Sequence, residues 1–166
     1  LLVEENIKGS YAARNLGAKN AKGEILAFTD ADCVVDKQWL YNSLKYFAED
    51  IGGVAGKVLG GEPKTLVEEY QLFRKALEQS RNFNHPYYPF AITANVIYKK
   101  IVFDKIGLFE TNWISGGDVD FSWRMQIYGK MKLVYADDCI VFHYHRTSPK
   151  GLYLQSKRHV YGACLL

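Results

Sequence analysis

The sequence predicts an α/β domain in which helices flank a mostly parallel sheet. Strand-like apolar runs alternate with segments of helical periodicity along the whole chain. Glycines stand at many of the boundaries between these segments, where the chain is expected to turn. With 166 residues, of which 48% are hydrophobic and 23% are charged, the chain has the size and composition of one globular domain.

The first part of the chain predicts a strand, a helix and a second strand. Residues 1–5 begin with three apolar side chains and fit a strand. Ser10 stands where a helix N-cap is expected, and the helix that follows closes by Gly23. Residues 24–29 then form a short apolar run with the length of a buried strand. Because the sequence starts without Met inside this pattern, we expect it to be a piece of a longer protein.

The middle of the chain predicts two helices on either side of one strand. Asp36 fits the N-cap of a helix that reaches about Ala48, with apolar residues at helical spacing. Residues 51–59 are rich in Gly and Val and predict a strand. Pro63 fits the first turn of a polar helix that runs to about Arg81.

The last part of the chain predicts shorter elements after an irregular segment at 82–90. In order, these elements are a strand at 91–98, a helix at 101–106, a loop at 108–117, a helix at 119–128, short strands at 133–136 and 139–143, and a basic helix at 151–162.

The charge and cysteine content exclude some classes of protein. A net charge of +3 is too small to indicate a nucleic-acid partner. After Asp138 the chain has basic but no acidic residues; this tail suits phosphate groups or an anionic membrane surface, or is a solvated helix face. Three cysteines without a CxxC pair argue against a disulfide framework and suit a reducing cytoplasm. No apolar run has the length of a membrane span, and no signal-peptide pattern opens the chain.

Two carboxylates follow the strand expected at 24–29. Asp30 and Asp32 are separated by one small residue, directly where the strand ends. Ligands of open α/β sheets bind at the carboxyl ends of strands, and carboxylate oxygens suit Mg²⁺ or Mn²⁺, which neutralises a diphosphate. A strand-to-loop turn explains the same two residues without any ligand, because Asp is common in turns.

A second pair of carboxylates, Asp118 and Asp120, follows two glycines at a loop–helix junction. Residues two positions apart face different sides of a helix, so we expect only one of them to point into a site. Asp118 fits either a helix N-cap or a general base that takes a proton from a hydroxyl.

A third group, His143 to Arg146, lies where the last strand is expected to end. Neutral imidazole completes Mn²⁺ sites that carboxylates begin, and a guanidinium binds phosphate oxygens. His145 shares the strand face of His143 if the strand continues past residue 143, so which of them acts stays open.

Taken in order, these motifs resemble family 2 glycosyltransferases of the GT-A fold, a Rossmann-like architecture. The resemblance begins at residues 13–17, 21–26 and 28–32, which lead into a DxD motif. It continues at Asn95 with residues 99–109, at residues 116–124 and at residues 143–162. The segment 116–124 is similar to the family's Gly-Glu-Asp-x-Asp-(aliphatic)-x-x-Arg motif. The match covers nearly the whole chain.

The resemblance implies a role for each of these residues. Asp30 and Asp32 hold the nucleotide-sugar diphosphate through Mn²⁺ or Mg²⁺, with Asp32 as the direct ligand. His143, with His145 as the alternative, supplies the remaining metal contact. Asp118 is the catalytic base. The implied substrate-binding residues are Arg14, Asp30, Asn95, Asp120, Arg124 and Arg146, of which Asp120 and Arg124 order the acceptor loop.

The implied reaction is inverting transfer of a sugar from a nucleoside-diphosphate sugar to a hydroxyl of a glycan or lipid-linked acceptor. The resemblance makes residues 1–150 a partial catalytic domain and 151–166 its basic C-terminal helix. We expect it to work in the cytoplasm, at the inner face of the membrane in polysaccharide or glycolipid assembly, with peripheral membrane contact and no nucleic acid.

Two departures from the family pattern keep other functions open. Gly117 replaces the Glu usual before the base, and the family's first nucleotide-binding strand is expected upstream of Leu1. A missing strand leaves a sheet edge for self-association and favours an inactive fragment or a non-catalytic binding module. A nucleotidyltransferase is a further alternative, as is a haloacid-dehalogenase-type phosphatase, although Val34 stands where that class has Thr.

Overall fold

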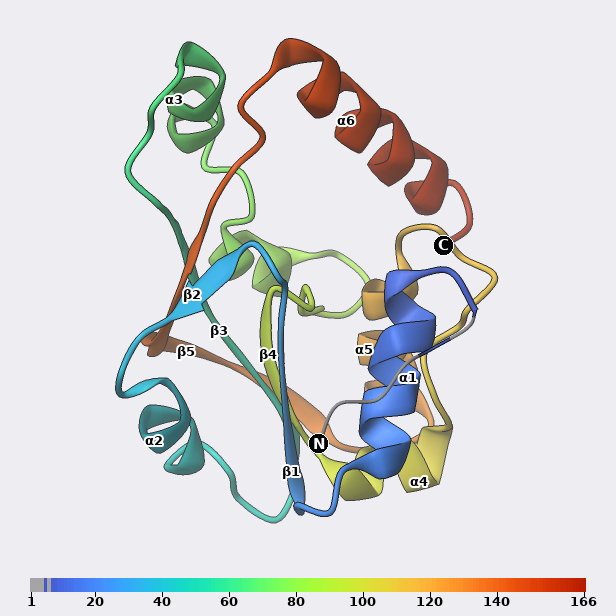
Figure 1. Ribbon diagram of the computed structural model, residues 1–166. Coiled ribbons are helices and arrows are strands. Elements are labelled where there is room, and N and C mark those ends of the chain that lie inside the picture. The colour runs from blue at the N-terminus through green and yellow to red at the C-terminus, as the bar shows by residue number, and fades with distance from the viewer. Residues whose placement is uncertain (1–4, 6) are drawn as a thin grey trace.

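One five-stranded sheet forms the centre of the fold. The computed structural model describes Glu5 and residues 7–166, so the strand expected at 1–5 lies almost wholly outside the described residues. The strands lie in the order β1-β4-β3-β5-β2 (Figure 1). Their bounds are β1 Ile25–Thr29, β2 Cys33–Val35, β3 Ile51–Gly60, β4 Asn95–Lys99 and β5 Lys132–His143.

The expectation of a mostly parallel sheet is wrong: the sheet is mixed and mostly antiparallel. Among the strands of the described residues, only β3 and β5 pair in parallel, whereas β1–β4, β3–β4 and β2–β5 pair antiparallel. The reason is the connection between β3 and β4, which stays at the end of the sheet where β3 finishes instead of crossing it (Figure 1). Strand β4 therefore runs back, and β1, β3 and β5 all point the same way. The carboxyl ends of these three strands still share one edge, as a site there requires.

The helices follow the expected order with different bounds. They are α1 Ser10–Asn20, α2 Trp39–Leu44, α3 Leu66–Phe73, the 3₁₀-helix η1 Gln79–Asn84, α4 Lys100–Ile106, α5 Gly117–Ile127 and α6 Pro149–Ala163.

Three expected helix boundaries are corrected by local backbone chemistry. Gly9, not Ser10, occupies the N-cap of α1. Asp36 lies three residues before α2, where its carboxylate accepts the Gln38 N–H at 2.8 Å in a turn. The long helix expected to reach Arg81 ends at Phe73, because Lys75 and Leu77 adopt positive φ angles of 52° and 68°.

The end of the sheet also differs from the expectation. The two short strands expected at 133–136 and 139–143 form the single strand β5, with a register shift against β3 between Gly56 and Lys57. Strand β2, which the sequence did not predict, pairs with the last three residues of β5.

The core has one cluster on each face of the sheet. Helices α1, α4 and α5 cover one face (Figure 1), where an aromatic group packs with ring centroids 4.4–6.2 Å apart. Its members are Phe28, Tyr98, Phe103, Phe109 and Phe121. A smaller cluster around Trp39 of α2 packs on the opposite face. Because β4 lies between both clusters, Asn95 through Tyr98 are all fully buried.

Helix α6 returns over the carboxyl edge of the sheet and closes on the loop before α5. Ser148 caps its N-terminus by accepting the Gly151 N–H at 3.2 Å. Near its other end, a Cβ at Gly162 would lie 2.6 Å from the backbone of Ser115, so only glycine permits this contact. Within the described part of the chain, the helices are too short or too polar to span a bilayer.

Candidate active site

A cleft of about 670 Å³ opens at the carboxyl edge of the sheet. Its walls come from α1, the β1–β2 turn, the loops before β4 and α5, the end of β5, and α6. Six of the predicted site residues line it together: Arg14, Asp30, Asp32, Asp118, His143 and Arg146.

Asp32 and His143 form one side of the cleft. The register of β2 against β5 pairs Cys33 with His143, and the Tyr144 N–H donates to the Asp32 carbonyl at 2.9 Å. This pairing leaves His143 Nε2 3.5 Å from Asp32 Oδ1, and Arg146 Nη2 3.6 Å from Asp32 Oδ2. Residues far apart in sequence thus converge on one carboxylate.

The donor set on this side fits a divalent cation. Ligand atoms of Asp32, Cys33 and His143 all lie within 4.8 Å of one another. Burial lowers the pKa of His143, which keeps the imidazole neutral and available as a ligand. Its buried Nδ1 has no hydrogen-bond partner among the described residues. One carboxylate and a neutral imidazole suit Mn²⁺, with Asp30 adjacent to Asp32.

Cys33 is a neighbour that sequence reasoning did not include. Burial raises the pKa of its thiol, so the sulfur stays protonated and is a poor ligand for a hard cation. The sequence showed only that Cys33 directly follows Asp32. Its proximity to His143 arises from the pairing of β2 with β5, which the sequence did not predict.

Asp30 is held by Arg14 rather than by the His143 side. Arg14 Nη2 lies 2.5 Å from Asp30 Oδ1, and its guanidinium carbon lies 5.4 Å from the centroid of the Tyr11 ring. Arg14 projects from α1 across the turn that follows β1. It therefore brings a positive charge to the same cleft wall as Asp32, where a diphosphate would need one.

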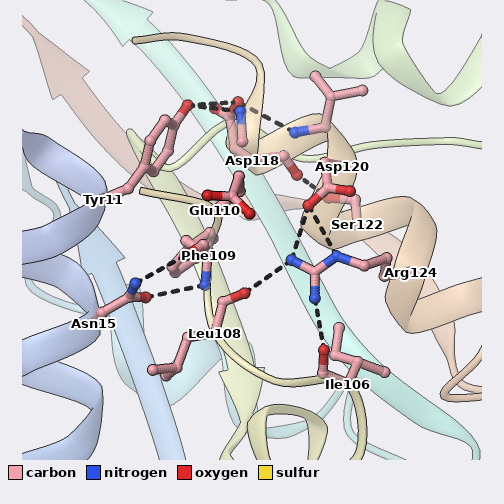
Figure 2. A network of polar contacts seen from close by, with 12 residues as sticks. Tyr11, Asn15, Ile106, Leu108, Phe109, Glu110, Asp118, Asp120, Ser122 and Arg124 are labelled. Atoms are coloured by element: carbon pink, nitrogen blue, oxygen red, sulfur yellow. Dashed lines mark hydrogen bonds and ion pairs between the residues drawn. The ribbon is translucent and has the colours of Figure 1, made fainter. Parts of the chain in front are cut away.

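Asp118 lies at the start of α5 on the other side of the cleft. Gly116, with a φ of 88°, is the N-cap of this helix, so the N-cap interpretation of Asp118 is wrong. Its Oδ1 accepts the Tyr11 hydroxyl at 3.2 Å (Figure 2). The same atom accepts the Val119 N–H at 3.1 Å, and Oδ2 accepts the Thr93 N–H at 3.3 Å. Burial outweighs these donors and raises the pKa of the carboxyl.

Asp120 and Arg124 pair with each other outside the cleft lining. Arg124 Nε donates to Asp120 Oδ2 at 2.8 Å. Its Nη1 and Nη2 donate to the carbonyls of Ile106 and Leu108 at 2.6 and 2.8 Å (Figure 2). The pair therefore ties α5 to the chain segment that follows α4.

Asn95 and His145 also lie outside the cleft. The Asn95 side chain accepts from Trp39 Nε1 at 2.7 Å and donates to the Lys57 and Cys139 carbonyls at 2.8 Å. With no exposed surface, it cannot reach a substrate in this structure, and its contacts are structural. The His145 ring packs beside the His143 ring at a tilt of 50°, with centroids 4.9 Å apart, but it lines a separate, smaller cavity.

Two cleft features were not predicted from the sequence. Tyr11 connects Asp118 to α1, and only its position one turn before Arg14 hinted at a shared face. Arg158 and His159 of α6 line the cleft beside Asp118. The sequence located this basic helix but offered no signal for where it packs.

Comparison with known proteins places the chain in a family. The profile described as "Glycosyl transferase family 2" matches residues 1–107. Glycosyltransferase AglE of Haloferax volcanii is 33% identical over 154 residues, which cover 86% of this chain and 47% of that protein. The pre-mycofactocin glycosyltransferase of Mycobacterium tuberculosis is 27% identical over 153 residues, 89% of this chain and 32% of that protein. The chain thus spans less than half the length of either relative.

Solved structures share the fold. A mannosyltransferase from Pyrobaculum calidifontis, in complex with GDP-Man and Mn²⁺, aligns with a TM-score of 0.62 at 21% identity over 95% of this chain and 42% of that one. TarS of S. aureus, in complex with UDP-GlcNAc, aligns with a TM-score of 0.52 at 20% identity over 89% of this chain and 42% of that one. The fold is thus that of the GT-A glycosyltransferases, and the chain belongs to glycosyl transferase family 2.

Proposed function

We propose that this chain forms the catalytic part of an inverting glycosyltransferase. It transfers a sugar from a metal-bound nucleoside-diphosphate sugar to an acceptor hydroxyl. The observation that carries the proposal is the cleft itself, in which a cation-binding group, Asp32 with His143, lies across from a half-buried carboxylate, Asp118. Metal-assisted displacement with a general base needs these two groups at one site.

The donor diphosphate binds on the Asp32 side. Asp32 and His143 would hold Mn²⁺ or Mg²⁺ there, with Asp30 beside them, and the cation would supply positive charge for the leaving diphosphate. Arg146, 3.6 Å from Asp32, and Arg14 bind phosphate oxygens directly. Mn²⁺ with GDP-Man in the mannosyltransferase of the same fold supports this arrangement.

The acceptor hydroxyl binds on the Asp118 side. Its oxygen attacks the anomeric carbon, the bond from that carbon to the diphosphate oxygen breaks, and the hydroxyl proton moves to Asp118. Burial raises the pKa of Asp118, which makes the ionised carboxylate a stronger base than an exposed aspartate. Attack from the side opposite the leaving group inverts the anomeric configuration.

The remaining parts of the proposal concern the acceptor and the place of reaction. We assign residues 1–150 to the catalytic domain and 151–166 to a helix of the same domain, which the contact of Gly162 with Ser115 supports. Asp120 and Arg124 act by ordering the segment before α5. The acceptor is a glycan or a lipid-linked glycan at the cytoplasmic membrane face, where basic residues of α6, Lys150 and Lys157, favour anionic surfaces.

The test uses the full-length protein that contains this chain, with GDP-mannose and UDP-GlcNAc as first donors. We expect sugar transfer, or slow donor hydrolysis without acceptor, that requires Mn²⁺ or Mg²⁺ and forms the inverted anomer, as followed by NMR of the anomeric proton. Transfer of the nucleotidyl group, release of inorganic phosphate alone, or a retained anomeric configuration would each contradict the proposal.

A further inference from the structure

A second cavity of about 280 Å³ lies beside the cleft, between α3, the turn into η1, and α6. Figure 1 shows α3 and α6 at the same end of the molecule, beyond the sheet. The residues of this cavity used below, here called the basic pocket, are Gln71, Arg74, Lys75, Leu77, Arg81 and His145.

Positive charge dominates the basic pocket. Arg74, Lys75 and Arg81 line it, and the described residues that line it include no acidic side chain. Two carboxylates lie near the basic pocket outside its lining. Glu78 is 3.1 Å from Arg81 and 3.8 Å from Lys75, and Glu68 of α3 acts electrostatically on His145. Two carboxylates against three cations leave a net positive charge, which attracts an anion.

The floor of the basic pocket is preorganised. Gln71 and His145 are only 3% and 8% exposed. Gln71 Nε2 donates to the Arg146 carbonyl at 2.9 Å, which fixes the amide between α3 and the end of β5. The His145 ring lines the cavity and packs against the His143 ring, with centroids 4.9 Å apart. These contacts hold the floor of the basic pocket in place.

The basic pocket adjoins the cleft. Leu77, Gln155 and His159 line both cavities. Leu77 has a φ of 68°, a left-handed conformation that branched side chains rarely adopt and that persists only where surrounding structure enforces it. This turn lies at the boundary between the two cavities, so a ligand that spans both would pass Leu77.

We propose that the basic pocket binds a phosphate group carried by the acceptor. This inference rests on the proposed function, because it assigns the group that anchors the acceptor while its hydroxyl points toward Asp118. Guanidinium groups of Arg74 and Arg81 bind phosphate oxygens in a forked geometry, and Lys75 adds a point charge. A phosphate monoester or diester, soluble or as a lipid headgroup, offers the same chemistry.

The experiment measures phosphate binding in the full-length protein after GDP and Mn²⁺ have been added in excess, so that the donor side is occupied. The probes are glycerol phosphate and vesicles of phosphatidylcholine with or without phosphatidic acid. NMR of the arginine Nε–H groups locates the soluble probe, and sedimentation measures vesicle binding. Arg74→Gln with Arg81→Gln is compared with a matched loss of two exposed charges, Lys19→Gln with Lys105→Gln.

We expect shifts at Arg74 and Arg81, and an affinity at least tenfold lower in the double arginine variant, with the lysine control within twofold of wild type. Tighter binding in the soluble or the vesicle arm identifies the source of the phosphate. Absence of shifts at both arginines, or equal losses in the two double variants, would overturn the inference. Because no sugar transfer is measured, failure of the proposed function would leave this result intact.

Discussion

The Tyr11 hydroxyl lies 3.2 Å from Oδ1 of Asp118, 107 positions later in the chain, and accepts the Gly117 N–H at 3.0 Å (Figure 2). The first helix thus fixes the carboxylate that opens α5. Arg14, one turn further along the same helix, pairs with Asp30. Helix α1 therefore links the donor and acceptor sides of the cleft.

Replacement of Tyr11 by Phe should slow transfer without weakening donor binding. The change removes a hydrogen bond that holds the Asp118 carboxylate in position, a contribution of roughly 1 kcal/mol, so the base is less well oriented and we expect kcat to fall about 5- to 10-fold. Steady-state kinetics check this. Tyr153→Phe, an exposed tyrosine of α6, is the control, and an unchanged kcat in Tyr11→Phe would show that the contact does not matter.

The pH dependence of the rate of sugar transfer should reflect the ionisation of the Asp118 carboxyl. A base must be ionised to act, and burial raises the pKa of this carboxyl, so the rate should fall as the pH drops through that raised pKa. The acidic limb should therefore lie above the ordinary aspartate value of about 3.9. In Tyr11→Phe the limb should move to still higher pH, because a donor to the charged form is lost. If the acidic limb of the Tyr11→Phe profile stays at the same pH as in wild type, the Tyr11 hydroxyl does not influence the titration of Asp118.

Replacement of Asp32 by Ala should abolish metal-dependent nucleotide binding, whereas Cys33→Ala should leave it within a few-fold of wild type. Asp32 lies 3.5 Å from His143 and supplies the carboxylate, while the raised pKa of Cys33 keeps its thiol protonated. Calorimetry with Mn²⁺ and GDP measures both. Loss of binding in Cys33→Ala alone would make sulfur the ligand and point to a softer metal.

Replacement of Arg124 by Met should destabilise the fold by roughly 2–4 kcal/mol, because it leaves Asp120 unpaired and removes the donors to the Ile106 and Leu108 carbonyls. Urea denaturation gives the free energy of unfolding. Lys132→Met, which breaks the exposed pair with Asp50, is the control and should change stability little. Equal effects in both variants would contradict an ordering role for Arg124.

The sequence predicted the positions of the cleft carboxylates in the fold better than it predicted the direction of the strands. Local patterns placed Asp30 and Asp32 after β1 and Asp118 at the start of α5, and the order of the motifs indicated that they meet. Strand direction was predicted wrongly, because alternation of helices and strands does not record whether a connection crosses the sheet. The segment between β3 and β4 does not cross it, and this reversed β4.

Residues whose role depends on tertiary contacts were the hardest to predict. Asn95 stands in a motif segment, yet its side chain satisfies Trp39 and two carbonyls inside the core. His145 would share a strand face with His143 if the strand continued, but β5 ends at His143 and His145 lines the neighbouring cavity. Tyr11 carried no signal of its own, because its contact with Asp118 forms only when α1 packs beside α5.

The most direct test of the account is the rate of sugar transfer by Asp118→Asn in the full-length protein, measured together with its Mn²⁺-dependent affinity for GDP. Asn keeps the size of the side chain but cannot accept a proton. If Asp118 is the catalytic base, we expect a rate about 10²- to 10⁴-fold lower than that of wild type, with nucleotide affinity unchanged within about threefold. A rate close to that of wild type would contradict the assignment of Asp118 as the catalytic base.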